Sequence, residues 1–248
     1  MDKKDILKLA QNHVYISGIY NYCDRWCERC PFTSRCMTYA MCEEDTSDSE
    51  ISNPDNEAFL DEMQTTAQQT IEMIAELAEE NDIDLDSLDV ESLSHEFSRR
   101  SAEAERHDFL QSARGYLEIT DVWFKSVFKE ILNATNTAAA DISDAVEIIS
   151  WYRHQIFVKL KRAMIHDDSA CIEEEDSMLP NDSDGSVKVA LIGIDRSIGA
   201  WGKLQGHFKE KKDNILHILL HLDRLRCRAE QEFPDARSFK RPGFDTLS

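Results

Sequence analysis

The sequence predicts an all-α protein, with a four-helix-bundle-like body and a small Cys-rich N-terminal metal module. Residues that break helices are scarce, since the 248-residue chain has five prolines and eight glycines, and residues 55–179 contain no proline and one glycine. Apolar residues recur along this stretch at intervals of three and four, as on the buried face of a helix. One segment alternates like a strand but has no partner strand elsewhere, so a sheet is not expected.

The first two predicted helices lie in the proline-free stretch. Residues 56–81 carry one apolar stripe with Gln and Glu elsewhere, which predicts a helix. Residues 92–132 carry a second stripe, and a helix of that length would be about 60 Å long at ~1.5 Å per residue. A kink at Gly115 or Ser101 is therefore expected.

Two further helical regions complete the predicted body. The third begins near Ala138 and places apolar residues on one side as far as Ala163. The fourth covers residues 186–232, and its first part, up to about residue 202, alternates as a strand would. Because a single strand makes no sheet, we expect this part to be helical as well.

The composition predicts the domain boundaries. We expect a metal-binding module over residues 1–43, an acidic linker over 44–56, the helical bundle over 57–233 and a tail over 234–248. The linker is expected because its residues offer almost nothing to bury.

The charge limits the classes of function. With 48 acidic and 28 basic residues the chain has a net charge of −20, which disfavours general nucleic-acid binding. No apolar run is long enough for a membrane span and no signal peptide is visible, so we expect a cytoplasmic protein. Residues 203–241 hold ten basic and six acidic residues, which makes a protein partner possible.

Five of the seven cysteines fall within twenty residues, at Cys23, Cys27, Cys30, Cys36 and Cys42. In a cytoplasmic protein thiols stay reduced, so a cluster of this kind indicates metal ligands rather than disulfides. Thiol chemistry and plain packing are the alternatives. The predicted ligands are Cys23, Cys27, Cys30 and Cys36, with Cys42 as a substitute.

The metal is inferred from the spacing. If residues 22–30 are helical, Cys23, Cys27 and Cys30 share one face but span about 10 Å along the axis, at ~1.5 Å per residue. Zinc needs its sulfurs within about 4 Å of one another, whereas a [4Fe–4S] cluster tolerates the wider spread. We therefore favour an iron–sulfur cluster slightly over zinc. If the segment is not helical, zinc is equally favoured.

The spacing C-x3-C-x2-C of Cys23, Cys27 and Cys30 resembles the cluster-binding signature of radical S-adenosylmethionine enzymes. That resemblance implies a βα barrel with the motif after its first strand. The predicted helices contain no such succession of strands, and the assignment is therefore not made.

Two other sets of ionisable residues are candidates for sites. Glu103 and His107 are the best candidates for a di-metal site of the ferritin-like kind. Arg153 and Asp195 each fall on an apolar stripe, and buried charges are costly unless they are paired. We therefore expect these two side chains to meet inside the bundle, as a structural pair or as part of a ligand pocket.

The sequence thus predicts a metal-binding helical protein with a redox or sensing role, and an iron–sulfur cluster is favoured slightly over zinc. A zinc-stabilised module that binds a protein partner is the first alternative, and a ferritin-like di-metal oxidase is the second. No catalytic residue and no oligomeric state can be assigned.

Overall fold

A computed structural model describes residues 3–45, 57–87, 89–132, 137–166 and 182–245 of the chain. Within these ranges the regular structure consists of α-helices and short 3₁₀ turns without any β-strand, so the all-α prediction is confirmed. The helices are α1 (Lys3–Gln11), α2 (Met37–Asp45), α3 (Glu57–Glu80), α4 (Val90–Arg106), α5 (Asp108–Leu132), α6 (Thr137–His166), α7 (Asp182–His207) and α8 (Lys212–Glu232).

The chain divides into two compact units, and the division differs from the predicted domains. Unit 1 comprises residues 1–20 and 27–96, and unit 2 comprises residues 21–26 and 97–248. Helix α3, which we expected in the bundle, therefore belongs with the N-terminal residues, whereas a short segment inside the cysteine run belongs with the bundle. Of the predicted linker, residues 46–56 lie outside the described part of the chain.

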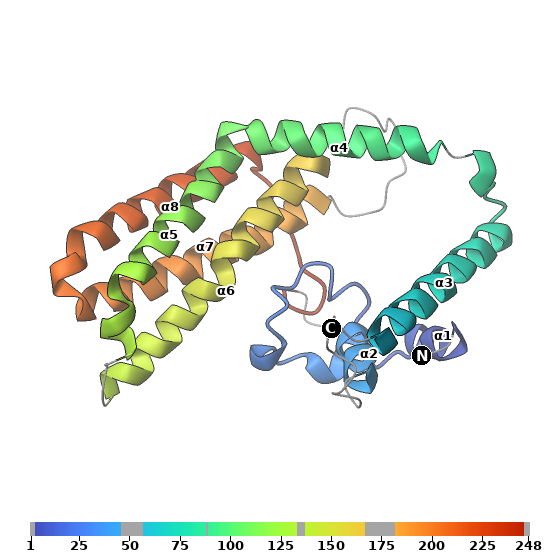
Figure 1. Cartoon of the computed structure of the whole chain (residues 1–248), viewed down its shortest axis with the longest axis horizontal. Helices are drawn as coiled ribbons and strands as arrows, with labels where there is room; N and C mark the ends of the chain where they lie inside the picture. The colour runs from blue at the N-terminus through green and yellow to red at the C-terminus, as the bar shows by residue number, and fades with distance from the viewer. Residues whose placement is uncertain (1–2, 46–56, 88, 133–136, 167–181, 246–248) are drawn as a thin grey trace. The chain divides into compact units, whose positions relative to one another are not determined.

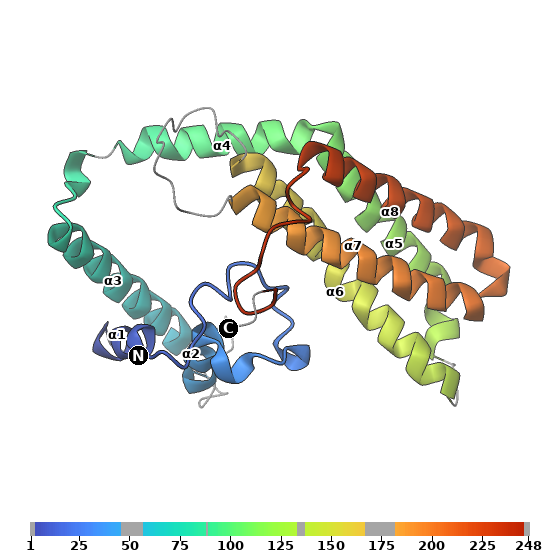
Figure 2. The ribbon, with the colours of Figure 1, turned by 180° about the vertical axis from the view of Figure 1, so that it is seen from behind.

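Unit 2 is built around a bundle of four helices, α5 to α8, in which consecutive helices run in opposite directions (Figure 1). Helix α6 lies beside α5 and α7, and α8 lies beside α5 and α7, as the opposite view also shows (Figure 2). The core holds large side chains that are almost fully buried, each stabilising the bundle by about 1.5–3 kcal/mol. They include Tyr116, Tyr152, Trp201, Phe109, Leu110, Ile149, Ile156, Leu160, Leu191, Ile194 and Leu204.

The long helix predicted over residues 92–132 is in fact two helices, α4 and α5. The break falls at His107 and not at Gly115 or Ser101. The His107 N–H donates to the carbonyl of Ala104, and the His107 carbonyl accepts the N–H of Gln111, so one residue ends α4 and starts α5. The break therefore needs no glycine.

The region with alternating hydrophobicity forms part of α7, as predicted, because its small residues allow close helix packing. A Cβ at Gly193 would lie 2.9 Å from Cδ1 of Tyr152 on α6 and 3.2 Å from Cγ1 of Ile156. The predicted fourth helical region is interrupted by a 3₁₀ turn over Lys209–Lys211, which separates α7 from α8.

Two non-helical segments pack on the bundle. The ring of Tyr22 lies 4.7 Å from the ring of Phe239 in the C-terminal tail. Both rings lie against Gly185 of α7, where a side chain would collide with Tyr22. Arg241 and Asp245 form an ion pair of 2.9 Å within the same tail. The described part of the predicted tail, residues 234–245, therefore packs within unit 2.

Candidate functional site

The cysteine segment is not helical where a helix was expected. Residues 21–23 form a turn and a bend, residues 24–26 have no regular structure, and a 3₁₀ turn follows over Cys27–Arg29. Two local features prevent a helix: Arg25 has a left-handed φ of 55°, and the Asp24 carboxylate accepts the Trp26 N–H at 3.2 Å. Cys23, Cys27 and Cys30 therefore do not spread along one helix axis, the geometry that favoured a [4Fe–4S] cluster over zinc.

Short turns place three of the cysteines in unit 1. The Cys30 N–H donates to the Cys27 carbonyl at 3.1 Å, which closes one 3₁₀ turn. Side chains three residues apart eclipse in such a turn, so Cys27 and Cys30 point to the same side. Cys36 follows the second 3₁₀ turn, Thr33–Arg35, and its carbonyl accepts the Ala40 N–H at the start of α2. The N-terminal end of a helix carries a partial positive charge, so it favours a negatively charged group at this position.

Backbone N–H groups reach two of the sulfur atoms. The Phe32 N–H donates to Sγ of Cys30 at 3.4 Å. The Arg25 N–H makes the equivalent bond to Cys23, again from two residues further along the chain. Burial raises the pKa of the Cys23 thiol, and the hydrogen bond from Arg25 opposes this increase by favouring the thiolate. Hydrogen bonds of this kind also support sulfur atoms that bind a metal.

Asp24 anchors its segment, which carries Cys23, to the bundle. Its carboxylate accepts hydrogen bonds from the hydroxyl of Tyr152 and, at 2.8 Å, from Nη1 of Arg196. Its backbone carbonyl accepts Nε1–H of Trp151 at 3.0 Å and Nε2–H of Gln155 at 2.9 Å. Helices α6 and α7 thus hold one short stretch of the cysteine run through a single aspartate.

Aromatic contacts and a lysine reinforce the same anchor. Trp26 is buried and stacks on Trp151 with ring centroids 5.1 Å apart, while the Tyr152 ring meets it edge-on at 5.8 Å. Lys159 donates to the carbonyl of Asn21 at 3.4 Å, and burial lowers its pKa. Tyr152 is buried beside Asp24, and both burial and this hydrogen bond raise its pKa, so the hydroxyl stays a donor at neutral pH.

The sequence did not point to Asp24, Tyr152 or Gln155 as members of a site. Tyr152 falls on the apolar stripe of residues 138–163, which by itself indicates a core position. The available signal was a carboxylate placed between two aromatic residues, Tyr22 and Trp26, inside a cysteine run. A charged residue in such a small apolar segment needs a partner from elsewhere in the chain.

The cysteines in the described part of the chain do not gather in one group of three or more ligands. Among the described residues, no group of three or more His, Cys, Asp or Glu side chains is placed to hold a metal ion. The six cysteines in the described ranges are not joined in disulfides. Cys42 lies exposed on α2 and Cys227 lies exposed on α8.

The candidate di-metal residues lie on the outside of the helices. Glu103 is exposed and pairs with Arg99 of the same helix at 2.9 Å, and the exposed His107 occupies the break between α4 and α5. Neither side chain projects into the core of the bundle, where a ferritin-like site would be built.

Arg153 and Asp195 each form an ion pair with a different residue. Arg153 pairs with Asp121 of α5, and Asp195 pairs with Arg237 at 2.6 Å. Helical geometry explains both outcomes, because Tyr152 and Gly193 occupy the contact between α6 and α7. At about 100° per residue, Arg153 turns away from Tyr152 toward α5, and Asp195 lies on the side of α7 opposite to Gly193.

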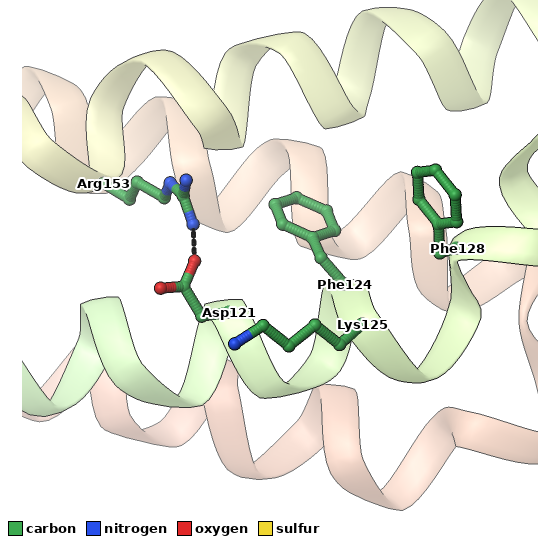
Figure 3. Close-up of a pocket in the computed structure, with 5 residues that line it drawn as sticks. All are labelled: Asp121, Phe124, Lys125, Phe128 and Arg153. Carbon is green, nitrogen blue, oxygen red and sulfur yellow. Dashed lines mark hydrogen bonds and ion pairs between the residues drawn. The ribbon is translucent and has the colours of Figure 1, made fainter.

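Arg153 lines an open hollow of about 320 Å³ between α5 and α6 (Figure 3). Its other lining residues are Asp121, Phe124, Lys125 and Phe128. The guanidinium lies 5.9 Å from the centre of the Phe124 ring, and its buried Nε has no hydrogen-bond partner within the described structure. The hollow therefore has a mixed apolar and cationic lining, with one carboxylate already bound to Arg153.

No protein-family model, no curated protein and no solved structure matches this chain. Among the described helices, none is both long enough and apolar enough to cross a membrane.

Proposed function

We propose that this chain is a metal-binding helical protein in which Cys27, Cys30 and Cys36 supply thiolate ligands. Cys23 or Cys42 would complete the set of four. The three central cysteines are partly buried in irregular backbone rather than packed inside a helix core. The proposed role is redox or sensing, because a centre near the surface can exchange electrons or respond to its surroundings.

The observation that carries the proposal is the backbone around Cys30. One 3₁₀ turn brings Cys27 and Cys30 to the same side, and the Phe32 N–H is already directed at the Cys30 sulfur. A cysteine that only fills space needs neither feature. A sulfur that binds a metal as thiolate gains from both, because hydrogen bonds stabilise its negative charge.

An iron–sulfur cluster is the first form that we propose. Three exposed arginines, Arg25, Arg29 and Arg35, flank the cysteines, and their charge would offset that of a thiolate-ligated cluster. Zinc is the second form. The C-x2-C spacing of Cys27 and Cys30 across one tight turn favours it, since this spacing is common in structural zinc sites.

Metal analysis of the intact chain tests the proposal. The protein is purified without oxygen, its iron, sulfide and zinc contents are measured, and its visible absorption is recorded. We expect stoichiometric iron and sulfide with a brown colour, or stoichiometric zinc without colour. Cys27→Ala and Cys30→Ala should lose the metal, while Cys227→Ala, at an exposed cysteine on α8, should retain it.

The fourth ligand is identified by comparing Cys23→Ala with Cys42→Ala, because only one of them should lower the metal content as Cys27→Ala does. The proposal is wrong if the anaerobic protein holds no metal and neither iron with sulfide nor zinc can be reconstituted into it. It is also wrong if the metal survives in Cys27→Ala. A reducing cytoplasm, where thiols persist, is the compartment that the proposal expects.

A further inference from the structure

The negative charge of the chain is concentrated in one region. Residues 43–96 contain 19 of the 48 acidic residues and none of the 28 lysines and arginines. The rest of the chain therefore has 29 acidic and 28 basic residues, which leaves a net charge of −1. The region that carries the charge includes α3 and the first part of α4.

The same region exposes apolar side chains. Within the described ranges fifteen large hydrophobic residues are exposed, and seven of them lie in residues 71–96, which we call the acidic arm. Scattered exposed apolar residues are ordinary on a protein surface, but a concentration of this kind marks an interaction site. The seven are Ile71, Ile74, Leu77, Ile83, Leu85, Val90 and Leu93.

The apolar and acidic residues of α3 lie on opposite faces. At about 100° per residue, Ile71, Ile74 and Leu77 fall within about 120° around the helix axis. The glutamates of this part of α3 fall on the other side, centred about 180° from Ile74. Ile71 is 60% exposed and Ile74 is 52% exposed, so this stripe is not covered. The glutamates are Glu72, Glu76, Glu79 and Glu80.

Local hydrogen bonds cap the end of α3 and the start of α4 within the arm. Helix α3 ends with Asp82 in the left-handed region, at a φ of 56°, and the Ile83 N–H donates back to the Ala78 carbonyl at 2.8 Å. Asp89 precedes the first residue of α4 and caps the helix, since its carboxylate accepts the Ser92 N–H at 3.0 Å. The sequence therefore specifies two capped helices and leaves their apolar stripes open.

We propose that the acidic arm binds a basic amphipathic helix of another protein. The apolar stripe would pack against the apolar face of the partner, and lysines or arginines flanking that face would meet the carboxylates. The arm has ten carboxylates and no lysine or arginine, so the arm of a second copy, a nucleic acid or an anionic lipid surface would be repelled. This proposal does not depend on the metal centre.

A designed peptide tests the proposal on the full-length chain. The probe is a helical peptide with leucine along one face and lysine elsewhere, and its control carries glutamate in place of each lysine. Isothermal titration calorimetry should detect the lysine peptide and not the glutamate peptide. Raising the salt from about 0.05 M to about 0.5 M should weaken binding about tenfold, because the charges are exposed.

Two variants separate the apolar contribution from simple charge attraction. Ile74→Ser combined with Leu77→Ser should weaken binding about tenfold, because it removes apolar contact area from the centre of the interface. The matched control is Val122→Ser, at a residue of α5 that is 67% exposed, and it should bind as the unchanged chain does.

Three results would overturn the proposal. In the first, the double variant binds the lysine peptide as tightly as the unchanged chain. In the second, the double variant melts at a lower temperature, which would show that the stripe packs within the protein. In the third, sedimentation shows that the unchanged chain self-associates and the double variant does not.

Discussion

Two glycines of α7 allow the packing of the bundle to be measured. A Cβ at Gly193 would lie 2.9 Å from Cδ1 of Tyr152, whose side chain is 1% exposed and has little room to move. A Cβ at Gly199 would meet nothing within 4 Å. The variants Gly193→Ala and Gly199→Ala therefore change the same helix in the same way but differ in what the new methyl group contacts.

The structure gives the size of the difference. Each alanine should gain about 0.5–1 kcal/mol, because glycine is a poor helix former. Gly193→Ala adds an overpacking cost of about 1–3 kcal/mol against Tyr152. We expect Gly199→Ala to be more stable than the unchanged protein, and Gly193→Ala to be about 1–3 kcal/mol less stable than Gly199→Ala.

Urea unfolding followed by tryptophan fluorescence measures this difference. All four tryptophans, Trp26, Trp123, Trp151 and Trp201, belong to unit 2, so the signal reports on the bundle alone. Because the gain in helix propensity is common to both variants, it cancels in their difference. Equal free energies of unfolding for the two variants would refute the close contact between α6 and α7 at Gly193.

Three further predictions concern the anchored segments. Tyr152→Phe removes a donor from the Asp24 carboxylate and should cost about 1.5–3 kcal/mol of bundle stability, measured by the same fluorescence assay. The Arg241 hydrogen bond holds the pKa of Asp245 below its usual 3.8. The stability that ionised Asp245 gives to the tail is therefore complete above pH 3.8 and is lost as the pH falls through the lower pKa of the folded protein. Amide exchange in the tail should become faster over this acid range in the unchanged protein, and Asp245→Asn should not show this pH dependence. Burial raises the pKa of Cys23, so in metal-free protein iodoacetamide should modify it more slowly at pH 8 than the exposed cysteine of α2, as mass spectrometry of the peptides would show.

The helices could be predicted from the sequence because their signals are local. The stripe of residues 56–81 predicts α3 closely, and the alternation after Ser186 was correctly attributed to a helix. The break at His107 could not be predicted, because its hydrogen bonds are available to any residue type. The sequence also could not show which helices form the bundle. An apolar stripe indicates that one face of a helix can be buried, but it does not identify the helix that packs against it.

The candidate site was harder to predict, because its key contacts join residues far apart in the chain. Asp24 meets Tyr152 and Arg196, more than a hundred positions away. Arg153 and Asp195 likewise meet partners that the local pattern does not identify, Asp121 and Arg237. A charged residue on an apolar stripe needs a partner, but the sequence does not show on which side of the helix the partner lies. That side depends on which residue fills the contact with the neighbouring helix, and on α6 this residue is Tyr152.

The net charge of −20 does not show that the two parts of the chain differ in their electrostatics. Within unit 2, charges are paired at the surface, as in Arg237 with Asp195 at 2.6 Å and Lys203 with Asp144 at 3.2 Å. Each such exposed pair is worth about 0–1 kcal/mol, so salt should change the stability of the bundle little. Residues 43–96 contain no lysine or arginine, so their negative charge is not balanced within this stretch of sequence. Salt should therefore affect what the acidic arm binds far more than how the bundle folds.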